Sequence, residues 1–390
     1  MKLSTWPFYD DEQISSVAKI LKSGRVNYWT GDQGKIFEKE FSDKFHAKYA
    51  VALANGSLAL SCAYLALGLK KDDEIITTPR TFIATSSSAV LLGIKPVFVD
   101  VDINSGNINY EKIEPAINKK TKAIVVVHLA GWPAEMKKIC ELAKKYGLYI
   151  IEDCSQAHGS KINNQNVGTF GDISTWSFCQ DKIITTGGEG GMLSTNNFKF
   201  FDKVWSFKDH GKSYEKINSK STISSYSFRW LHDNFGSNFR LTEMQSIIGR
   251  FQLKMLDNWI VIRNRNARIL TSYISELNQI RVPIPPDNIV HSYYKYYCYV
   301  NQSSFLTDWN RERVIEELNN NGFPAYSGSC SEIYLERCFK NNGLSPENNL
   351  NIASELGKTS FMFLVHPTLS VEQMHLYGKA ILSIFKKALK

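Results

Sequence analysis

Long hydrophobic runs are missing from this sequence. No stretch of the 390-residue chain is apolar over the length of a bilayer-spanning helix, and no apolar segment with a basic flank stands at its start. Both absences argue against a membrane-spanning or exported protein, so we predict a cytoplasmic chain without a membrane partner. Hydrophobic residues make up 43% and charged residues 22% of the sequence, which is typical of a globular protein.

Paired cysteines are lacking as well. The sequence has 7 cysteines, an odd number, and no two of them form a CxxC pair. Such spacing indicates neither a disulfide framework nor a zinc site, so we predict reduced thiols and no bound metal.

Basic tracts with interleaved aromatic residues are also absent. The net charge of +8 is modest for this length, and the short lysine clusters lie where helices are expected to end. We therefore predict no nucleic-acid partner. A mildly positive chain suits a small anionic substrate.

What the sequence does contain is a regular alternation of apolar and amphipathic segments. Strands are predicted over residues 49–54, 74–79, 96–102, 123–129 and 148–153. Helices are predicted between them, over residues 58–69, 84–92, 110–118 and 136–146. The alternation favours an α/β fold, a mostly parallel sheet with helices on both faces whose strands end along one edge. Ligands bind at that edge in open α/β sheets.

The rest of the chain predicts a second, smaller domain. Helices are expected over residues 11–23 and 37–45, and two more over 242–256 and 257–277, after a long loop at 212–233. Three prolines at 283, 285 and 286 then indicate a junction, beyond which strand-like and helical segments alternate. We predict a large α/β domain with the N-terminal segment over residues 1–255, and a small α+β domain over 256–390.

Lys182 stands between two unusual segments. Residues 174–178 predict a short buried strand, and Gly187–Gly191 is too rich in glycine for the interior of a helix or strand. Partial removal from water lowers the pKa of a lysine, and a neutral amine can form a Schiff base with a carbonyl group. The alternative is an ordinary loop lysine beside a turn.

Two further features follow the first and second predicted strands. Asn55-Gly56-Ser57 opens a helix, so its backbone N–H groups and the Ser57 hydroxyl can hold a phosphate, unless the serine only caps the helix. Phe82 follows the second strand, where its ring can stack on a flat cofactor or pack into the core.

Asp153 ends another buried strand. Its carboxylate can hold a proton on a heterocyclic nitrogen or cap the next turn, and Gln156 lies within reach of the same ligand. A helix N-terminus for a phosphate, an aromatic for a ring, a carboxylate for a pyridine nitrogen and a lysine for an aldehyde together match pyridoxal 5′-phosphate (PLP). The order Ser57, Phe82, Asp153, Lys182 is more specific than any one of these residues.

Four motifs carry a resemblance to a known family. They are residues 31–41 with Asn55–Leu60, Ile151–Gly159, Trp176–Gly191 around Lys182, and Gly236–Gln245. In these motifs the chain resembles the sugar aminotransferases of the DegT/DnrJ/EryC1/StrS family, over nearly its whole length. The resemblance implies the aspartate aminotransferase fold (fold type I) and PLP as the cofactor.

The resemblance also implies a role for each matching residue around the cofactor ring. Lys182 would hold PLP as a Schiff base, Asp153 would pair with the ring nitrogen, and Phe82 would stack on the ring. Gln156 would contact the ring 3-hydroxyl.

The phosphate of the cofactor would be held by a second group of residues. Ser57, the Leu58 backbone and Ser177 would come from the same subunit. Asn238 matches a family asparagine that reaches the phosphate bound by the other subunit, which implies a homodimer with shared active sites.

The implied reaction is a transamination in two halves. Glutamate gives its amino group to PLP, leaving pyridoxamine phosphate (PMP) and 2-oxoglutarate, and PMP then aminates a ketone on a nucleotide-linked sugar. Lys182 would move the proton between substrate and cofactor carbons. The product would serve amino-sugar synthesis for surface polysaccharides such as lipopolysaccharide. The alternatives are a related PLP enzyme with another acceptor, such as a keto-cyclitol, and a non-catalytic member that binds the cofactor as a regulator.

Substrate contacts are predicted for residues that lie near the expected sugar or its charged groups. These residues are Asn27, Tyr28, Trp29, Arg80, Cys179, Arg240, Ser329 and His366. The first three match a sugar-site loop of relatives, and the last two come from the small domain. The two arginines are candidate partners for the glutamate carboxylate or the nucleotide diphosphate, with salt bridges as the alternative.

Two positions bear on which substrate and which reaction of the family this chain has. Many relatives carry histidine where this chain has Cys179, so a donor and a possible charge are missing beside the cofactor phosphate. Relatives that are 3-dehydratases replace the Schiff-base lysine with histidine, so Lys182 argues against that chemistry.

Overall fold

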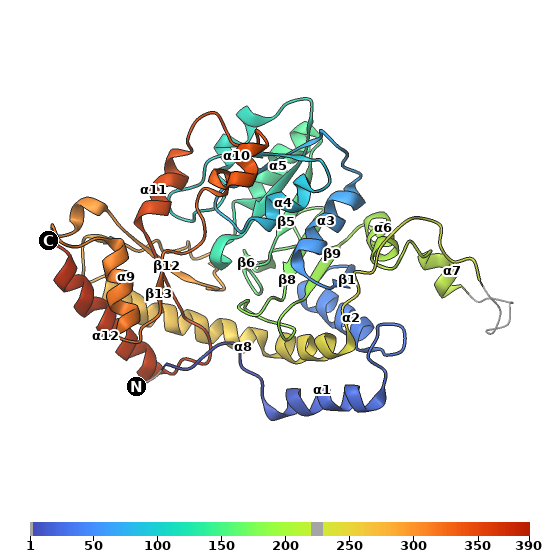
Figure 1. Cartoon of the computed structure of the whole chain (residues 1–390), viewed down its shortest axis with the longest axis horizontal. Coiled ribbons are helices and arrows are strands. Elements are labelled where there is room, and N and C mark those ends of the chain that lie inside the picture. The colour runs from blue at the N-terminus through green and yellow to red at the C-terminus, as the bar shows by residue number, and fades with distance from the viewer. Residues whose placement is uncertain (1–2, 220–228) are drawn as a thin grey trace.

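The computed structural model describes residues 3–219 and 229–390, which form a large lobe and a small lobe (Figure 1). The large lobe is built on a seven-stranded sheet in the order β1-β9-β8-β5-β4-β2-β3. In that order its strands are Tyr49–Leu53, Gly191–Thr195, Ile173–Ser177, Tyr149–Asp153, Thr121–Val127, Glu74–Thr77 and Lys95–Phe98. Only β9 runs antiparallel to its neighbours, so the predicted mostly parallel sheet is confirmed.

Alternating side chains explain why helices cover both faces of this sheet. On β1, Val51 and Leu53 pack with α3 (Gly56–Leu67) and α6 (Phe198–Lys208). Ala50 and Ala52 point the other way and pack with three phenylalanines of α2 (Gln33–Phe45). The period of two residues between the faces is that of a strand buried on both sides. The α5 helix (Met136–Tyr146) covers the same face as α2 further along the sheet, and α4 is Ala84–Val90.

The small lobe contains an antiparallel sheet in the order β10-β12-β14-β13. Its strands are Ile280–Arg281, Tyr296–Val300, Ser360–Phe363 and Ala325–Tyr326, and its helices are α9 (Arg311–Asn320), α10 (Arg337–Asn341), α11 (Asn351–Thr359) and α12 (Val371–Ala388). One hydrophobic cluster joins this sheet to α9 and α12. A third, small sheet pairs β11 (Ile289–Val290) with β6 (Lys161–Ile162) and β7 (Gln165–Asn166).

One long helix, α8 (Glu243–Ile274), runs beneath both lobes (Figure 1). The prediction of two helices that meet at residues 256 and 257 is therefore wrong, because neither proline nor glycine interrupts the sequence there. The predicted domain boundary falls inside this helix. Leu253 and Leu256 pack with the large lobe, whereas Leu270 and Ile274 belong to the core of the small lobe.

The N-terminal segment reaches the small lobe before it enters the large one. Leu3 packs against the small-lobe core, and the Ser4 hydroxyl donates to Gln373 Oε1 over 3.2 Å. The chain then crosses to α1 (Asp11–Ser23), whose bounds were predicted correctly. The first residues therefore do not belong only to the large domain to which the sequence assigned them.

Other expectations were wrong or only partly tested. Residues 110–118 form two short 3₁₀ turns rather than a helix, because Pro115 lacks the N–H that an α-helix needs. The loop predicted over 212–233 contains the short helix α7 (Tyr214–Asn218), and its residues 220–228 lie outside the described part. Across the described ranges, none of the helices combines the length and hydrophobicity needed to span a bilayer.

Candidate active site

A cavity of about 1620 Å³ opens where the parallel strands end and the two lobes meet. The loops that follow β1, β2, β5 and β8 supply one wall, and the small lobe and the N-terminal segment supply the other. Ten of the predicted site residues line it. They are Ser57, Leu58, Phe82, Asp153, Gln156, Ser177, Cys179, Lys182, Ser329 and His366.

Lys182 lies in the loop after β8 and points into this cavity rather than into bulk water. Its side chain is 17% exposed, and its Nζ contacts Asp181 Oδ1 and the Tyr294 hydroxyl, both at 3.2 Å. The Tyr294 hydroxyl in turn donates a short hydrogen bond to Asp181. Two glycines with positive φ, Gly187 and Gly188, let the loop turn back into β9, as the glycine-rich segment predicted.

Asp153 ends β5 as a buried carboxylate, 4% exposed. Its Oδ2 accepts a hydrogen bond from the Thr85 hydroxyl over 2.8 Å, and its Oδ1 accepts one from the Ser155 N–H over 3.2 Å. Within the described ranges Asp153 forms no salt bridge. A buried carboxylate without a cation is costly, so a protonated ring nitrogen is a fitting partner for it.

The N-terminus of α3 meets the end of β8 at the same cavity. Asn55 caps the helix by accepting the Leu58 N–H over 2.9 Å, so this backbone group is already engaged. A Cβ at Gly56 would meet the Ser177 Cβ at 2.8 Å, so only glycine allows the two segments to approach this closely. Ser57 stays exposed at the positive end of the helix dipole, where anions bind.

Phe82 and Gln156 complete the part of the cavity that fits a flat cofactor. The Phe82 side chain is 69% exposed, which leaves a ring face open to stack on a ligand. The side-chain oxygen Oε1 of Gln156 accepts a hydrogen bond from the Ala130 N–H over 2.8 Å, so the side-chain NH₂ group of Gln156 remains as a donor. These donors, the Asp153 carboxylate without a salt bridge, the helix N-terminus and the Lys182 amine fit PLP.

Five other predicted residues lie outside the cavity of their own chain, in one neighbourhood around Asp209. The Trp29 indole N–H and the Arg240 guanidinium donate to the buried Asp209 carboxylate over 2.6 Å and 2.7 Å. Asn238 forms a backbone bridge with Asp209. Tyr28 donates to Glu38, and the Asn27 side chain accepts the Trp29 N–H.

Arg80 is also absent from the cavity lining. It is fully buried, donates a short hydrogen bond to the Ser331 hydroxyl, and lies over the Tyr297 ring at 5.4 Å. Its Nε and Nη2 have no hydrogen-bond partner. Access to an anion would require the small lobe to move away from it.

Among the lining residues that the sequence did not single out are Trp6, Arg263, Tyr294 and Lys295. Burial lowers the pKa of Lys295 to about 8 and that of Arg263 to about 9. Arg263 was detectable in principle, because it stands on the apolar face of α8 between Ile260 and Ala267, where a charge is unusual.

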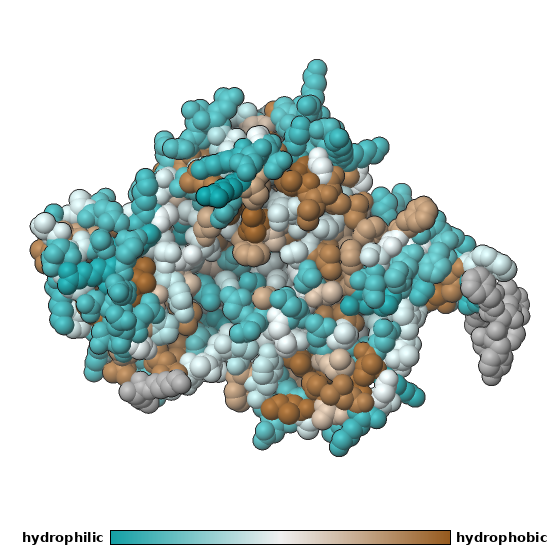
Figure 2. Space-filling model, viewed as in Figure 1, coloured by the Kyte–Doolittle hydropathy of each residue, from teal (hydrophilic) through white to brown (hydrophobic). Residues whose placement is uncertain are grey.

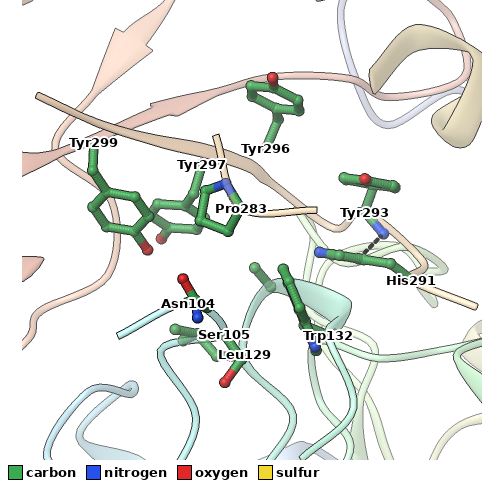
Figure 3. A pocket seen from close by; sticks show the side chains of 11 residues that line it. Asn104, Ser105, Leu129, Trp132, Pro283, His291, Tyr293, Tyr296, Tyr297 and Tyr299 are labelled. Carbon is green, nitrogen blue, oxygen red and sulfur yellow. Dashed lines mark hydrogen bonds between the residues drawn. The ribbon is translucent and has the colours of Figure 1, made fainter. Parts of the chain in front are cut away.

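Two other features of the described residues lie apart from the cavity that Lys182 lines. His128, Glu152 and Cys154 have the composition of a metal site, but Glu152 accepts three backbone N–H groups and a His128 contact, which occupies its oxygens. Figure 3 shows a second hollow between the lobes, where His291 and Tyr293 stack at 3.9 Å. Its volume of about 20 Å³ suits a single water molecule rather than a substrate.

Comparisons with known proteins identify the family of the chain. The profile described as the DegT/DnrJ/EryC1/StrS aminotransferase family matches residues 7–381. The GDP-perosamine synthase of Escherichia coli O157:H7 is 38% identical over 317 residues, which are 80% of each chain. The UDP-N-acetyl-3-dehydro-alpha-D-glucosamine 3-aminotransferase of Acidithiobacillus ferrooxidans is 35% identical over 291 residues, 75% of this chain and 74% of that one.

A solved structure matches the whole fold. The aminotransferase from Psychrobacter cryohalolentis superposes with a TM-score of 0.96 at 46% sequence identity, and the match covers 99% of both chains. The chain therefore belongs to the DegT/DnrJ/EryC1/StrS aminotransferase family and is a PLP-dependent sugar aminotransferase.

Proposed function

We propose that this enzyme transfers an amino group from glutamate to a ketone on a nucleotide-linked sugar, in amino-sugar biosynthesis for a surface polysaccharide such as lipopolysaccharide. The observation that carries the proposal is that Lys182 and Asp153 face one cavity beside the N-terminus of α3. PLP, when bound, supplies an electron sink and carries the amino group between the two half-reactions of a ping-pong cycle, as PMP.

Asp153 would keep the ring nitrogen of the cofactor protonated. Its buried position strengthens the interaction with a cation, and the Thr85 hydroxyl holds the carboxylate in one orientation. Phe82 would stack on the ring, and the Gln156 amide would donate to the ring 3-hydroxyl.

Ser57 and Ser177 would hold the cofactor phosphate at the N-terminus of α3. The hydroxyl groups and the helix dipole both favour a dianion there. Because the Leu58 N–H already donates to Asn55, we expect the Ser57 N–H to contribute more than the Leu58 N–H.

Lys182 Nζ would accept a proton from the substrate carbon and return it to the neighbouring position as general base and acid. The Tyr294 hydroxyl and Asp181 hold this amine in the cavity, each 3.2 Å from Nζ. The reacting atoms would lie between the sheet edge and the small lobe, because residues of both lobes line the cavity.

The substrate class is supported by two observations. The cavity of about 1620 Å³ exceeds the roughly 300–1,000 Å³ of pockets for single small ligands, so it has room for a nucleotide sugar beside the cofactor. The relatives named above act, by their names, on GDP- and UDP-linked sugars. Ser329, His366 and Cys179 would face the sugar from the cavity wall.

We further propose that the enzyme works in the cytoplasm, where free thiols such as those of its 7 cysteines stay reduced. We also propose that it is a homodimer with shared active sites. Exposed hydrophobic side chains support association, among them Leu91 at 85% and Ile14 on α1 at 58% exposure. Figure 2 shows hydrophobic surface over α1 and over the region of α3 and α4. The exposed Asn238 would reach the partner's cofactor phosphate, and the neighbouring Asn27–Trp29 loop and Arg240 would approach the partner's sugar site.

The proposal is tested with purified protein and added PLP. We expect a Schiff-base absorption band that glutamate bleaches, release of 2-oxoglutarate, and amination of at least one member of a panel of nucleotide-linked 3- and 4-ketosugars. Lys182→Ala should lose the band and the activity together. Full activity of Lys182→Ala, or a glutamate-bleached enzyme that aminates none of the nucleotide-linked ketosugars in the panel, would refute the proposal.

A further inference from the structure

Three cationic side chains line the cavity near the carboxylate of Asp181. Lys182, Arg263 and Lys295 all line it, and Asp181 is the acidic residue that contacts two of them. Burial lowers the pKa of His366, in the same wall, to about 3, so this histidine adds no charge at neutral pH. This part of the cavity therefore carries an excess of positive charge.

Arg263 is the most buried of the three cations, with 1% exposure. Its Nη1 donates to the backbone carbonyl oxygens of Tyr293 and Tyr294 over 3.1 Å and 3.4 Å, and its Nε has no hydrogen-bond partner. In the parts of the chain that are described, Arg263 forms no salt bridge, and its face is covered by the Trp6 ring at 5.3 Å. A buried guanidinium without an anion is costly unless a ligand supplies one.

Lys295 has only a weak partner of its own. Its Nζ lies 3.7 Å from Asp181 Oδ2, while the other oxygen of that carboxylate contacts Lys182 at 3.2 Å. The Lys295 side chain is 17% exposed, whereas the Asp181 side chain is 51% exposed. Asp181 can therefore turn toward solvent, while the two lysines remain at the cavity.

We propose that Arg263 and Lys295 bind a carboxylate of the amino donor beside the amine of Lys182. The inference rests on the proposed function, because it assigns a site for the glutamate that reacts there. It replaces Arg80 and Arg240, which the sequence suggested, since one lies outside the cavity lining and the other is paired with Asp209.

The position of the two cations favours the amino donor over the sugar nucleotide as the source of the anion. Lys182 and Lys295 contact the two oxygens of one carboxylate, so a bound carboxylate at Lys295 lies close to the reacting amine. In an α-amino acid the carboxylate is attached to the carbon that carries the nitrogen. In a nucleotide-linked ketosugar the diphosphate is separated from the ketone by atoms of the sugar ring, which places it nearer the cavity mouth.

Asp181 acts in this scheme as an internal carboxylate that the substrate displaces. It occupies Lys182 and Lys295 in the absence of donor and is held by the Tyr294 hydroxyl. Removing its charge should therefore strengthen donor binding, whereas removing the charge of Lys295 should weaken it. These opposite signs are not expected of variants that merely disturb folding.

The experiment measures binding of glutarate, a dicarboxylate without a reactive nitrogen, to the PLP-loaded enzyme by isothermal titration calorimetry. Lys295→Gln and Arg263→Lys should each raise the dissociation constant by about 10-fold or more, because each removes or displaces a charged hydrogen bond. Asp181→Asn should lower it. Lys145→Gln, which removes an exposed charge on α5, should bind glutarate as the wild type does.

A parallel titration with UDP separates the two possible sources of the anion. The proposal expects Lys295→Gln to change UDP affinity much less than glutarate affinity, and to raise the KM for glutamate without a similar rise for the ketosugar. It is overturned if glutarate affinity is unchanged in Lys295→Gln, or falls no more than UDP affinity. Lys295-dependent glutarate binding in an enzyme that aminates no nucleotide sugar would support this inference and refute the acceptor assigned above.

Discussion

The indole N–H of Trp6 donates a hydrogen bond to the backbone carbonyl oxygen of Lys182 over 3.0 Å. The Trp6 ring also meets Trp259 edge-on at 5.0 Å and stacks near His366 at 6.2 Å. The next residue toward the N-terminus, Thr5, accepts a hydrogen bond from Thr368 of the small lobe. The first residues of the chain thus connect the loop of Lys182 to the small lobe, which makes Trp6 a positioning residue.

Trp6→Phe keeps an aromatic ring but removes this hydrogen bond. We expect PLP to bind roughly fivefold more weakly, because a net hydrogen bond contributes about 1 kcal/mol. Titration of the Schiff-base band with PLP measures the change. Trp309→Phe is the matched control, since Trp309 is half-buried in the small lobe against Arg313. Equal PLP affinity in Trp6→Phe and wild type would show that Trp6 does not position the lysine.

The frame of the large lobe was predictable because it depends on local pattern. Strands such as Tyr149–Asp153 are short apolar runs between amphipathic helices, and parallel strands bring their carboxyl ends to one edge. Residues at the ends of these strands or in the loops that follow them, including Asp153 and Lys182, could therefore be placed at one cavity from the sequence.

The other side of the cavity was not predictable in the same way. Trp6, Arg263 and Lys295 come from three distant segments and meet Lys182 only through tertiary packing. The hydrophobic periodicity within one segment does not indicate which distant residues it contacts. Conversely, Trp29 and Arg240 looked like free contacts for a ligand, but both are bonded to Asp209, a partner that sequence spacing does not reveal.

Thr85→Val should impair the enzyme through Asp153. Valine keeps the volume of threonine but removes the hydroxyl that donates to Asp153 Oδ2 over 2.8 Å. A buried carboxylate that loses this donor is less well oriented, so we expect the rate of the glutamate half-reaction to fall about 10-fold or more. Stopped-flow loss of the Schiff-base band measures it. Thr271→Val, which removes a hydroxyl from the small lobe, should retain the wild-type rate; the same loss in both variants would contradict a specific role for Thr85.

Shared active sites predict complementation between two inactive variants. If Asn238 serves the partner's site, a hybrid dimer of Lys182→Ala and Asn238→Ala has both defects in one site and neither in the other. Random association on co-expression should then restore about a quarter of the wild-type activity. Differently tagged subunits allow the hybrid to be isolated and assayed. Hybrids as inactive as the parent dimers would place Asn238 in the site of its own chain.

Buried neutral histidines predict a loss of stability in acid. Burial lowers the pKa of His158 to about 3, and neither of its ring nitrogens has a hydrogen-bond partner. In the unfolded chain His158 binds a proton near pH 6.5, whereas in the folded chain it stays neutral down to about pH 3. The neutral histidine therefore contributes its full stability above pH 6.5, and this contribution is lost progressively as the pH falls toward about 3.

His158→Phe should remove this sensitivity while it keeps an aromatic ring against Trp176 and Phe178. Between about pH 7.5 and about pH 5, the unfolding free energy of the wild type should fall by about 2 kcal/mol more than that of the variant. Urea unfolding at the two pH values measures the difference. His375→Phe, at an exposed position on α12, should lose as much stability as the wild type. An equal loss in His158→Phe would mean that His158 does not stay neutral in the folded chain.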